Sequence, residues 1–139
     1  MKINFMLIDD RDIDLFITQK IIEKLPLDSN FKTFTKAKAA MEYLSSLNTK
    51  MGFEPTFFPD IILVDINMPE MNGFQFLNKF SELKNDKLNA IKIYMLSSTT
   101  NLTDIIDAEQ NDVCDGFISK PLTAHRVESI VNELRKPCV

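Results

Sequence analysis

The chain has 139 residues, 45% of them hydrophobic, which suits one domain over residues 1–139 with a substantial core and leaves no room for an output domain. Its 16 Lys and Arg against 20 Asp and Glu give a net charge of -4 without a marked basic cluster, so we expect no nucleic-acid partner. The apolar N-terminal stretch stops at Asp9, too early for a signal peptide or a membrane span, so we expect a cytoplasmic protein with no membrane partner.

The first half of the chain reads as strand, helix, strand and helix. A strand over residues 3–8 precedes a helix from residue 12 to about residue 25, whose apolar residues recur at helical spacing: Ile13, Phe16, Ile17, Ile21 and Leu25. A short strand over residues 31–35 precedes a helix over residues 37–47, which carries one apolar stripe: Ala40, Met41, Leu44 and Leu47.

Residues 48–59 read as a loop because they contain Gly52, Pro55 and Pro59. The loop also holds four large apolar side chains: Met51, Phe53, Phe57 and Phe58. We expect these side chains to fold back onto the domain, and a partner-binding patch is the alternative.

The second half continues the alternation. A strand over residues 61–64 leads through a turn to a helix with Phe74, Leu77 and Phe80 on one side, and a strand over residues 91–96 follows a polar turn at 85–89. A helix over 102–110, a strand over 116–119 and a helix over about 123–136 complete the chain. This order predicts an α/β fold, a doubly wound parallel sheet of five strands with five helices.

Acidic residues stand where two of these strands end. Asp9 and Asp10 follow the first strand, and Asp65 follows the buried run Ile61-Ile62-Leu63-Val64. If the two strands lie side by side and parallel, three carboxylates meet at one edge of the sheet, where ligands of such folds bind. Three like charges that close repel one another and need a cation.

Magnesium suits such a site because it prefers oxygen ligands and commonly shares its site with a phosphoryl group. Asp10 and Asp65 can supply carboxylate oxygens, the backbone carbonyl near Asn67 a third ligand, and Asp9 can act through water. Lys120 and Ser97, which follow two other strands, can neutralise phosphoryl oxygens. This set permits attack by an Asp65 oxygen on phosphorus to form an aspartyl phosphate.

At these positions the chain resembles the receiver domain of two-component response regulators, of the chemotaxis type. The resemblance covers nearly the whole chain and rests on four segments: Asp9-Asp10, the run from Asp65 to Gly73, Ser97, and Lys120-Pro121. It implies a flavodoxin-like sheet with strand order 2-1-3-4-5.

The resemblance also implies a role for each residue of the set. Asp65 would be the phospho-acceptor, taking its phosphoryl group from a sensor histidine kinase or a histidine phosphotransfer protein. Asp9 and Asp10 would be the metal-binding pair, Lys120 the phosphate-binding lysine, Ser97 the switch hydroxyl and Phe117 the switch aromatic. The fourth helix, fifth strand and fifth helix would form the surface for a downstream protein target.

Two positions depart from the family pattern. Phe117 stands where tyrosine is frequent, which would make the switch one of packing without a hydrogen bond from the ring. Ser98 stands where alanine is common, which would alter water access to the phosphoryl group and its lifetime.

Three other functions fit the sequence less well than a phosphorylation-dependent signalling switch. A haloacid-dehalogenase-like phosphatase needs an Asp general acid two residues after its nucleophile, where this chain has Asn67. A flavin or nucleotide binder needs a glycine-rich loop after the first strand. A receiver-shaped module that works without phosphorylation usually lacks part of the acidic set. We therefore expect no enzyme activity beyond phosphorylation and dephosphorylation of Asp65.

Overall fold

The computed structural model describes residues 2–49, 57–83 and 88–135. Five parallel strands form one sheet in the order β2-β1-β3-β4-β5. Their bounds are β1 Lys2–Ile8, β2 Asp28–Phe34, β3 Ile61–Val64, β4 Lys92–Ser97 and β5 Gly116–Ser119. The predicted flavodoxin-like order 2-1-3-4-5 is confirmed.

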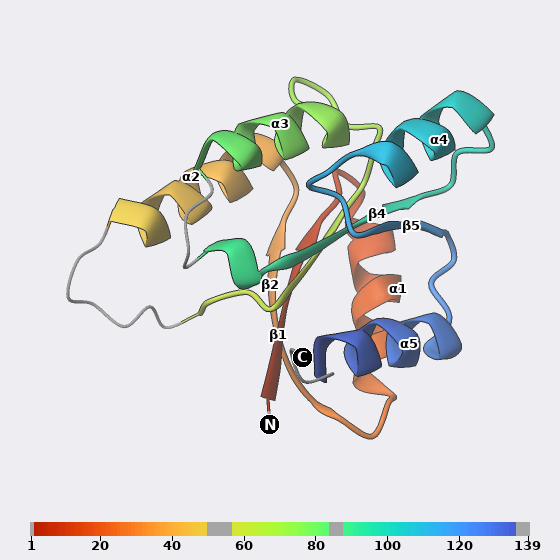
Figure 1. Cartoon of the computed structure of the whole chain (residues 1–139). Helices are drawn as coiled ribbons and strands as arrows, with labels where there is room; N and C mark the ends of the chain where they lie inside the picture. Colours follow the sequence, from red (N-terminus) through yellow and green to blue (C-terminus); the bar gives the residue numbers. More distant parts are fainter. Residues whose placement is uncertain (1, 50–56, 84–87, 136–139) are drawn as a thin grey trace.

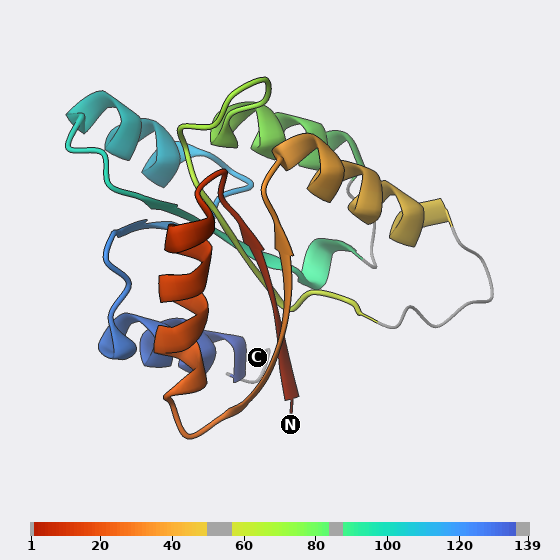
Figure 2. The same cartoon turned by 180° about the vertical axis from the view of Figure 1, so that it is seen from behind.

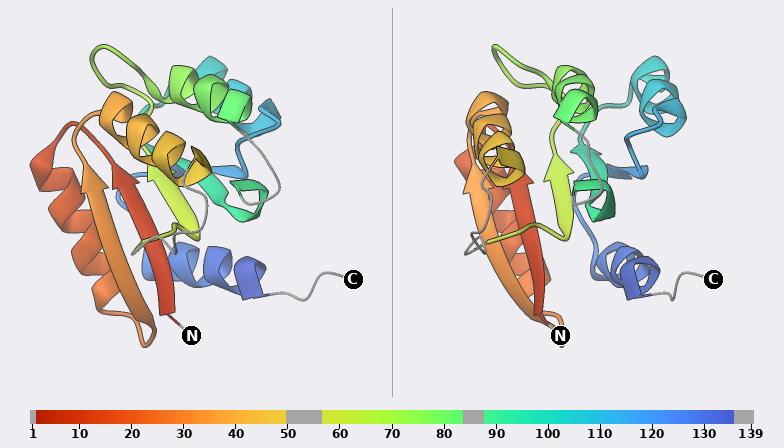
Figure 3. Two further views of the ribbon diagram at one scale, coloured as in Figure 1. Left: turned by 90° about the vertical axis from the view of Figure 1, so that its left-hand side faces the viewer. Right: turned by 60° about the vertical axis from the view of Figure 1, so that its left-hand side comes forward.

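Helices cover both faces of this sheet (Figures 1 and 2). One face carries α1 (Asp12–Glu23) and α5 (Ala124–Arg135), and the other carries α2 (Ala37–Thr49), α3 (Gly73–Leu83) and α4 (Leu102–Gln110). A short 3-10 helix, η1 (Leu88–Ala90), precedes β4. In Figure 1 the strands run between the two sets of helices, and Figure 3 turns the molecule so that β1 and β2 are seen side by side.

Alternate strand residues feed two separate cores, because successive side chains of a strand point to opposite faces. In β1, Met6 and Ile8 join the core under α2, α3 and α4, whereas Phe5 and Leu7 join the core under α1 and α5. β3 is buried at all four positions and lies at the centre of the sheet. A continuous apolar run is therefore the expected sequence for this strand.

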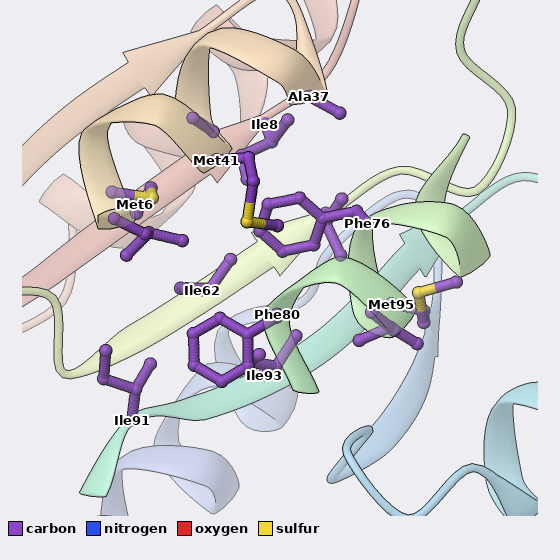
Figure 4. Packing of buried hydrophobic residues seen from close by; sticks show 14 of the residues in the cluster. Met6, Ile8, Ala37, Met41, Ile62, Phe76, Phe80, Ile91, Ile93 and Met95 are labelled. Atoms are coloured by element: carbon purple, nitrogen blue, oxygen red, sulfur yellow. The ribbon is translucent and has the colours of Figure 1, made fainter. Parts of the chain in front are cut away.

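The core under α2 and α3 is formed largely by aromatic and long aliphatic side chains. Figure 4 shows Phe76 and Phe80 of α3 lying between that helix and the strands that carry Ile62 and Ile93. The rings of Phe76 and Phe80 stack with centroids 6.5 Å apart. The predicted stripe on α2 is buried at all four of its positions: Ala40, Met41, Leu44 and Leu47.

The buried face of α1 only partly matches its apolar spacing, since two residues of that spacing, Ile21 and Leu25, pack partly buried against the core under α1 and α5. The helix is present as predicted, but its buried residues are Leu15, Thr18 and Ile22. Ile13 and Phe16 are 63% and 59% exposed, and Ile17 is also exposed. The apolar residues of α1 therefore exceed what the core uses, and part of them faces outward.

β2 begins earlier than predicted. The strand was expected at residues 31–35 but covers Asp28–Phe34, pairing with β1 from Lys2↔Asp28 to Ile8↔Phe34. Asp28 and the two polar residues after it lie in β2, which among the described residues is an edge strand with a neighbouring strand on one side only, so polar side chains reach solvent. Backbone pairing with β1 outweighs the poor strand propensity of these residues.

The aromatic loop is described only in part. Phe57 and Phe58 are partly buried and pack against the core under α2 and α3, as expected for side chains that fold back onto the domain. Met51 and Phe53 lie outside the described residues. Among those that are described, no helix is long and apolar enough to cross a membrane.

Candidate functional site

Pairing of β1 with β3 places two acidic residues side by side at the carboxyl end of the sheet. Ile8 is opposite Val64 in the register, so the next residues, Asp9 and Asp65, leave the sheet together. The Asp65 backbone N–H donates to the Ile8 carbonyl over 2.9 Å, which extends the ladder by one bond past the strands. Both positions are thus set by backbone hydrogen bonds of the sheet.

Asp10 completes a group of three carboxylates. Asp9, Asp10 and Asp65 each offer an oxygen, and these three oxygens lie within 4.8 Å of one another; we call these three residues the acidic cluster. Asp9 and Asp65 are buried, whereas Asp10 is exposed, so the group opens to solvent on one side. Such a group could hold a metal ion.

Lys120, the residue after β5, reaches across the sheet to this group. Its Nζ lies 2.6 Å from Asp9 Oδ2 and 3.9 Å from Asp65 Oδ2, so it donates a hydrogen bond to Asp9 and only a longer ion pair links it to Asp65. The Lys120 backbone N–H donates to the Ser97 carbonyl over 2.9 Å, which anchors the end of β5 to the end of β4. The Lys120–Pro121 peptide bond is cis.

The pKa of Asp65 is raised above its ordinary value, chiefly because burial disfavours the charged form. The charge of Lys120 lowers it, the neighbouring charge of Asp9 raises it, and backbone hydrogen bonds from Ile66 and Asn67 lower it. For Lys120, burial acts to lower the pKa, but the hydrogen bond to Asp9 and the charge of Asp65 outweigh it, so the pKa is raised. Lys120 is therefore an ammonium group at neutral pH.

The loop between β3 and α3 holds Asp65 by close backbone contact. The Gly73 N–H donates to the Ile66 carbonyl over 2.8 Å, and a Cβ at Gly73 would lie 2.6 Å from the Asp65 carbonyl oxygen. Asn72 and Gln75 exchange side-chain hydrogen bonds with each other's backbone N–H, both over 2.9 Å, which is a capping box at the start of α3. The Asn-Gly pair in the sequence thus ends the loop and begins the helix.

The remaining predicted residues, Ser97, Phe117 and Asn67, lie in or just after β4, β5 and β3 and differ in burial. Ser97 is buried at the end of β4, and its Oγ accepts a hydrogen bond from the Thr99 N–H over 3.3 Å. Phe117 pairs with Met95 of β4, is half-buried and packs against the core under α2 to α4. Asn67 has an exposed side chain, and its backbone N–H bonds to the Asp65 carboxylate.

Asp14 also belongs to this site and was not singled out in the sequence. It lies in the first turn of α1, and its Oδ2 is 3.1 Å from Lys120 Nζ. Acidic residues are common in the first turn of a helix because they complement its dipole, so Asp14 carried no distinguishing signal. Only the approach of the β5 end to α1 reveals its partner.

The residues present fit a hard divalent cation. The donors of the acidic cluster are carboxylate oxygens on one open-sided group, which is the ligand type that Mg2+ prefers. Asp9, Asp14 and Asp65 lie within 4 Å of Lys120 Nζ, and Asp10 belongs to the same acidic cluster. These four carboxylates outweigh the one ammonium group, so the site keeps an excess of negative charge that a divalent ion would neutralise.

Comparison with known proteins gives consistent matches. The model of the response regulator receiver domain family matches residues 5–132. The chemotaxis protein CheY of Listeria monocytogenes is 27% identical over 123 residues, which are 88% of this chain and 93% of CheY. The chain spans about half the length, or less, of other curated relatives that it matches.

Solved structures agree over almost the full length of the chain. The crystal structure of a two component response regulator from Cytophaga hutchinsonii is 32% identical, with a TM-score of 0.84 over 96% of this chain and 98% of that one. A response regulator receiver protein from Dyadobacter fermentans is 29% identical, with a TM-score of 0.81 over 97% of this chain and 99% of that one. The chain belongs to the response regulator receiver domain family of two-component signalling.

Proposed function

We propose that this protein is a phosphorylation-dependent signalling switch that accepts a phosphoryl group on Asp65 with Mg2+. The observation that carries the proposal is the meeting of three carboxylates from β1 and β3, within 4.8 Å of one another, with Lys120 from the end of β5. Asp9, Asp10 and Asp65, with the backbone carbonyl of Asn67, would hold the ion. When bound, Mg2+ would supply positive charge that neutralises phosphoryl oxygens and screens the carboxylates.

The chemistry needs little from the protein beyond a placed nucleophile. An Asp65 carboxylate oxygen attacks phosphorus, a P–O bond forms, and the P–N bond to the donor histidine breaks with its electrons going to the imidazole. Lys120 faces the developing charge with an ammonium group, and Ser97 donates its hydroxyl proton to a phosphoryl oxygen. Asp65 needs no separate base because a carboxylate is already the reactive form.

Ser97 is the first link in a short chain of hydrogen bonds that leads to α4. The Thr99 N–H donates to Ser97 Oγ over 3.3 Å, the Asn101 N–H donates to Thr99 Oγ1 over 3.1 Å, and the Thr103 N–H donates to the Asn101 side chain over 2.9 Å. Turning Ser97 toward a phosphoryl group would break the first of these bonds. We propose that this change, with inward movement of Phe117, alters the surface of α4, β5 and α5 that a downstream protein reads.

Exposed apolar residues on α4 support this output surface. Leu102 is 68% exposed and Ile106 is 42% exposed, which leaves two large side chains open to solvent on the helix that the hydrogen-bond chain reaches. Apolar side chains in such positions favour contact with another protein.

The phosphodonor would be a histidine kinase or histidine phosphotransfer protein that docks on α1. Ile13, Phe16 and Ile17 expose apolar surface there, and Ile17 lines a hollow of about 220 Å³ together with Lys120 and Asp14. A donor seated on these side chains would bring its phosphohistidine close to Asp65. Phe16→Ala should then slow labelling by a phosphohistidine protein and leave labelling by acetyl phosphate unchanged; equal effects on both would argue against docking on α1.

The decisive measurement is the intact mass of the protein after incubation with acetyl phosphate and Mg2+. We expect one phosphoryl adduct on the native chain and no adduct in Asp65→Asn. We also expect no adduct on the native chain when a chelator removes Mg2+ before acetyl phosphate is added. Asp60→Asn is the matched control, since Asp60 lies at the opposite end of the same strand, and it should be labelled like the native chain.

Absence of an adduct on the native chain, or an undiminished adduct in Asp65→Asn, would reject the proposal in favour of a receiver-shaped module that works without phosphorylation. Steady release of phosphate from added phosphate esters would instead favour the phosphatase alternative, although Asn67 stands where that mechanism requires an acid.

A further inference from the structure

Lys120 is shared unequally between the carboxylates around it. Its Nζ lies 2.6 Å from Asp9 and 3.1 Å from Asp14, but 3.9 Å from Asp65. An ammonium group has three N–H donors, and the two hydrogen bonds that it makes to carboxylates here go to Asp9 and Asp14. Lys120 is therefore drawn toward the α1 side of the site, beyond hydrogen-bond distance of the proposed acceptor.

Asp14 is not part of the group that could hold a metal ion. The residues of the acidic cluster are Asp9, Asp10 and Asp65, and within the part of the chain that the structure describes no other group of this kind is found. Asp14 comes from a helix rather than from a strand end, and its Oδ2 accepts a hydrogen bond from Lys120 Nζ. Its effect on the site must therefore pass through that lysine or through its own charge.

The Asp14–Lys120 pair borders solvent. Side-chain exposure is 23% for Asp14 and 15% for Lys120, and both line the same hollow of about 220 Å³. An ion pair in this position can open without disturbing the core, because water can reach the carboxylate that Lys120 leaves. The ammonium group can then move from one anion to another.

We propose that Asp14 is a positioning residue that holds Lys120 away from Asp65 in the unphosphorylated protein and thereby weakens binding of a phosphoryl group at Asp65. The inference rests on the proposed function. A contact made only in the free state lowers the affinity for whatever must break it, and the Asp14 charge also repels phosphoryl oxygens. Asp14 would therefore set how readily the switch is turned on.

The test is a titration of the full chain with beryllofluoride, a phosphoryl mimic, at saturating Mg2+, followed by NMR. Asp14→Asn keeps the shape and an acceptor oxygen but removes the charge, and we expect its Kd to fall by about threefold to fivefold. Asp12→Asn is the matched control, because Asp12 lies exposed in the same helical turn and loses the same charge; its Kd should stay near that of the native chain. Asp14→Glu keeps the negative charge, so its Kd should stay closer to the native value than that of Asp14→Asn.

A second readout needs no phosphoryl mimic. The side-chain NMR signals of Lys120 in the unligated protein should shift in Asp14→Asn and stay unchanged in Asp12→Asn, because only the former loses an ion-pair partner of Lys120. A change in folding alone would not give this selective result.

If the Kd of Asp14→Asn equals that of Asp12→Asn, or is higher than that of the native chain, the inference is overturned while the proposed function stands. If the native chain itself binds no beryllofluoride, the proposed function fails, and the inference fails with it.

Discussion

Aspartates lie at both ends of the sheet, but their partners differ. At the amino end, the Asp60 carboxylate before β3 accepts the Asn4 backbone N–H over 2.8 Å, and the Asp115 carboxylate before β5 accepts the Ile93 backbone N–H over 2.8 Å. At the carboxyl end, Asp9 and Asp65 also accept backbone N–H groups, but together with Asp10 they form one acidic cluster beside Lys120.

The difference separates structural carboxylates from those of the proposed phosphorylation site. Asp60 and Asp115 each satisfy a backbone donor at the start of a strand, so they add to stability wherever that donor would otherwise lack a partner. The carboxylates of the acidic cluster repel one another, so the carboxyl end holds charge that favours a cation. An aspartate next to a strand is thus informative only when its neighbours are known.

The largest effect on stability is expected from a substitution at Gly73, where the backbone passes close to Asp65. Gly73→Ala would place a Cβ 2.6 Å from the Asp65 carbonyl oxygen and 2.9 Å from Met95, so we expect a loss of about 2–3 kcal/mol in the free energy of unfolding. Gly116→Ala is the control, because its Cβ would meet only side-chain atoms at 3.3 Å or more. Urea unfolding measures both, and equal losses would contradict the argument.

The next effect tests the structural role of the amino-end carboxylates. Asp60→Ala removes the acceptor of the Asn4 N–H, so we expect a loss of about 1–2 kcal/mol in the free energy of unfolding, with phosphorylation by acetyl phosphate retained. Asp107→Ala, an exposed position on α4, should change the urea midpoint little. If Asp60→Ala were as stable as the native chain, the contrast between the two ends would be lost.

At the carboxyl end, removal of a carboxylate should raise the stability of the protein instead of lowering it. Because burial and the charge of Asp9 raise the folded-state pKa of Asp65 despite the opposing effect of Lys120, the folded protein holds this proton more tightly than the unfolded chain does. The stabilising contribution is present at low pH and is lost as pH rises through the raised pKa. In metal-free buffer at neutral pH, Asp65→Asn should therefore unfold at a Tm roughly 2–4 °C higher than the native chain.

The pH dependence provides the check on that prediction. The Tm difference between Asp65→Asn and the native chain should be small near pH 4 and grow toward about pH 7. Addition of Mg2+ should reduce this Tm difference, because the ion binds the native Asp65 carboxylate more strongly than the amide that replaces it. A difference that is constant with pH would point to a cause other than ionisation of Asp65.

The smallest effect concerns the loop after Asp65. Glu70 has a φ of 68°, a left-handed conformation that costs a residue with a side chain about 1 kcal/mol relative to glycine. Glu70→Gly should raise the free energy of unfolding by up to about 1 kcal/mol, less the entropy that glycine adds to the unfolded chain. Glu70→Ala removes the same charge but keeps the strain, so a similar gain in that variant would contradict the explanation.

Much of the architecture followed from local patterns. The apolar run Ile61–Val64 gave a buried strand and placed Asp65 at its end, and the alternation of elements gave the parallel sheet. Three features did not follow: the early start of β2, the buried face of α1, and the pairing of Asp14 with Lys120.

These three share a physical cause. Whether Asp28 joins a strand depends on the backbone of β1 beside it, and which side of α1 is buried depends on the sheet beneath it. The spacing of apolar residues in the sequence indicates only that α1 has more of them than one buried face requires. It cannot tell a core contact from a surface that another protein would cover.

The sequence alone determined which residues end the strands, because hydrophobic runs stop where polar residues begin and the backbone of a parallel sheet brings those ends to one edge. The tertiary structure decided how the charges are divided there. Lys120 and Asp14 are 106 positions apart in the chain, and only the packing of the β5 end beside α1 brings that lysine to Asp14 and Asp9 rather than to Asp65.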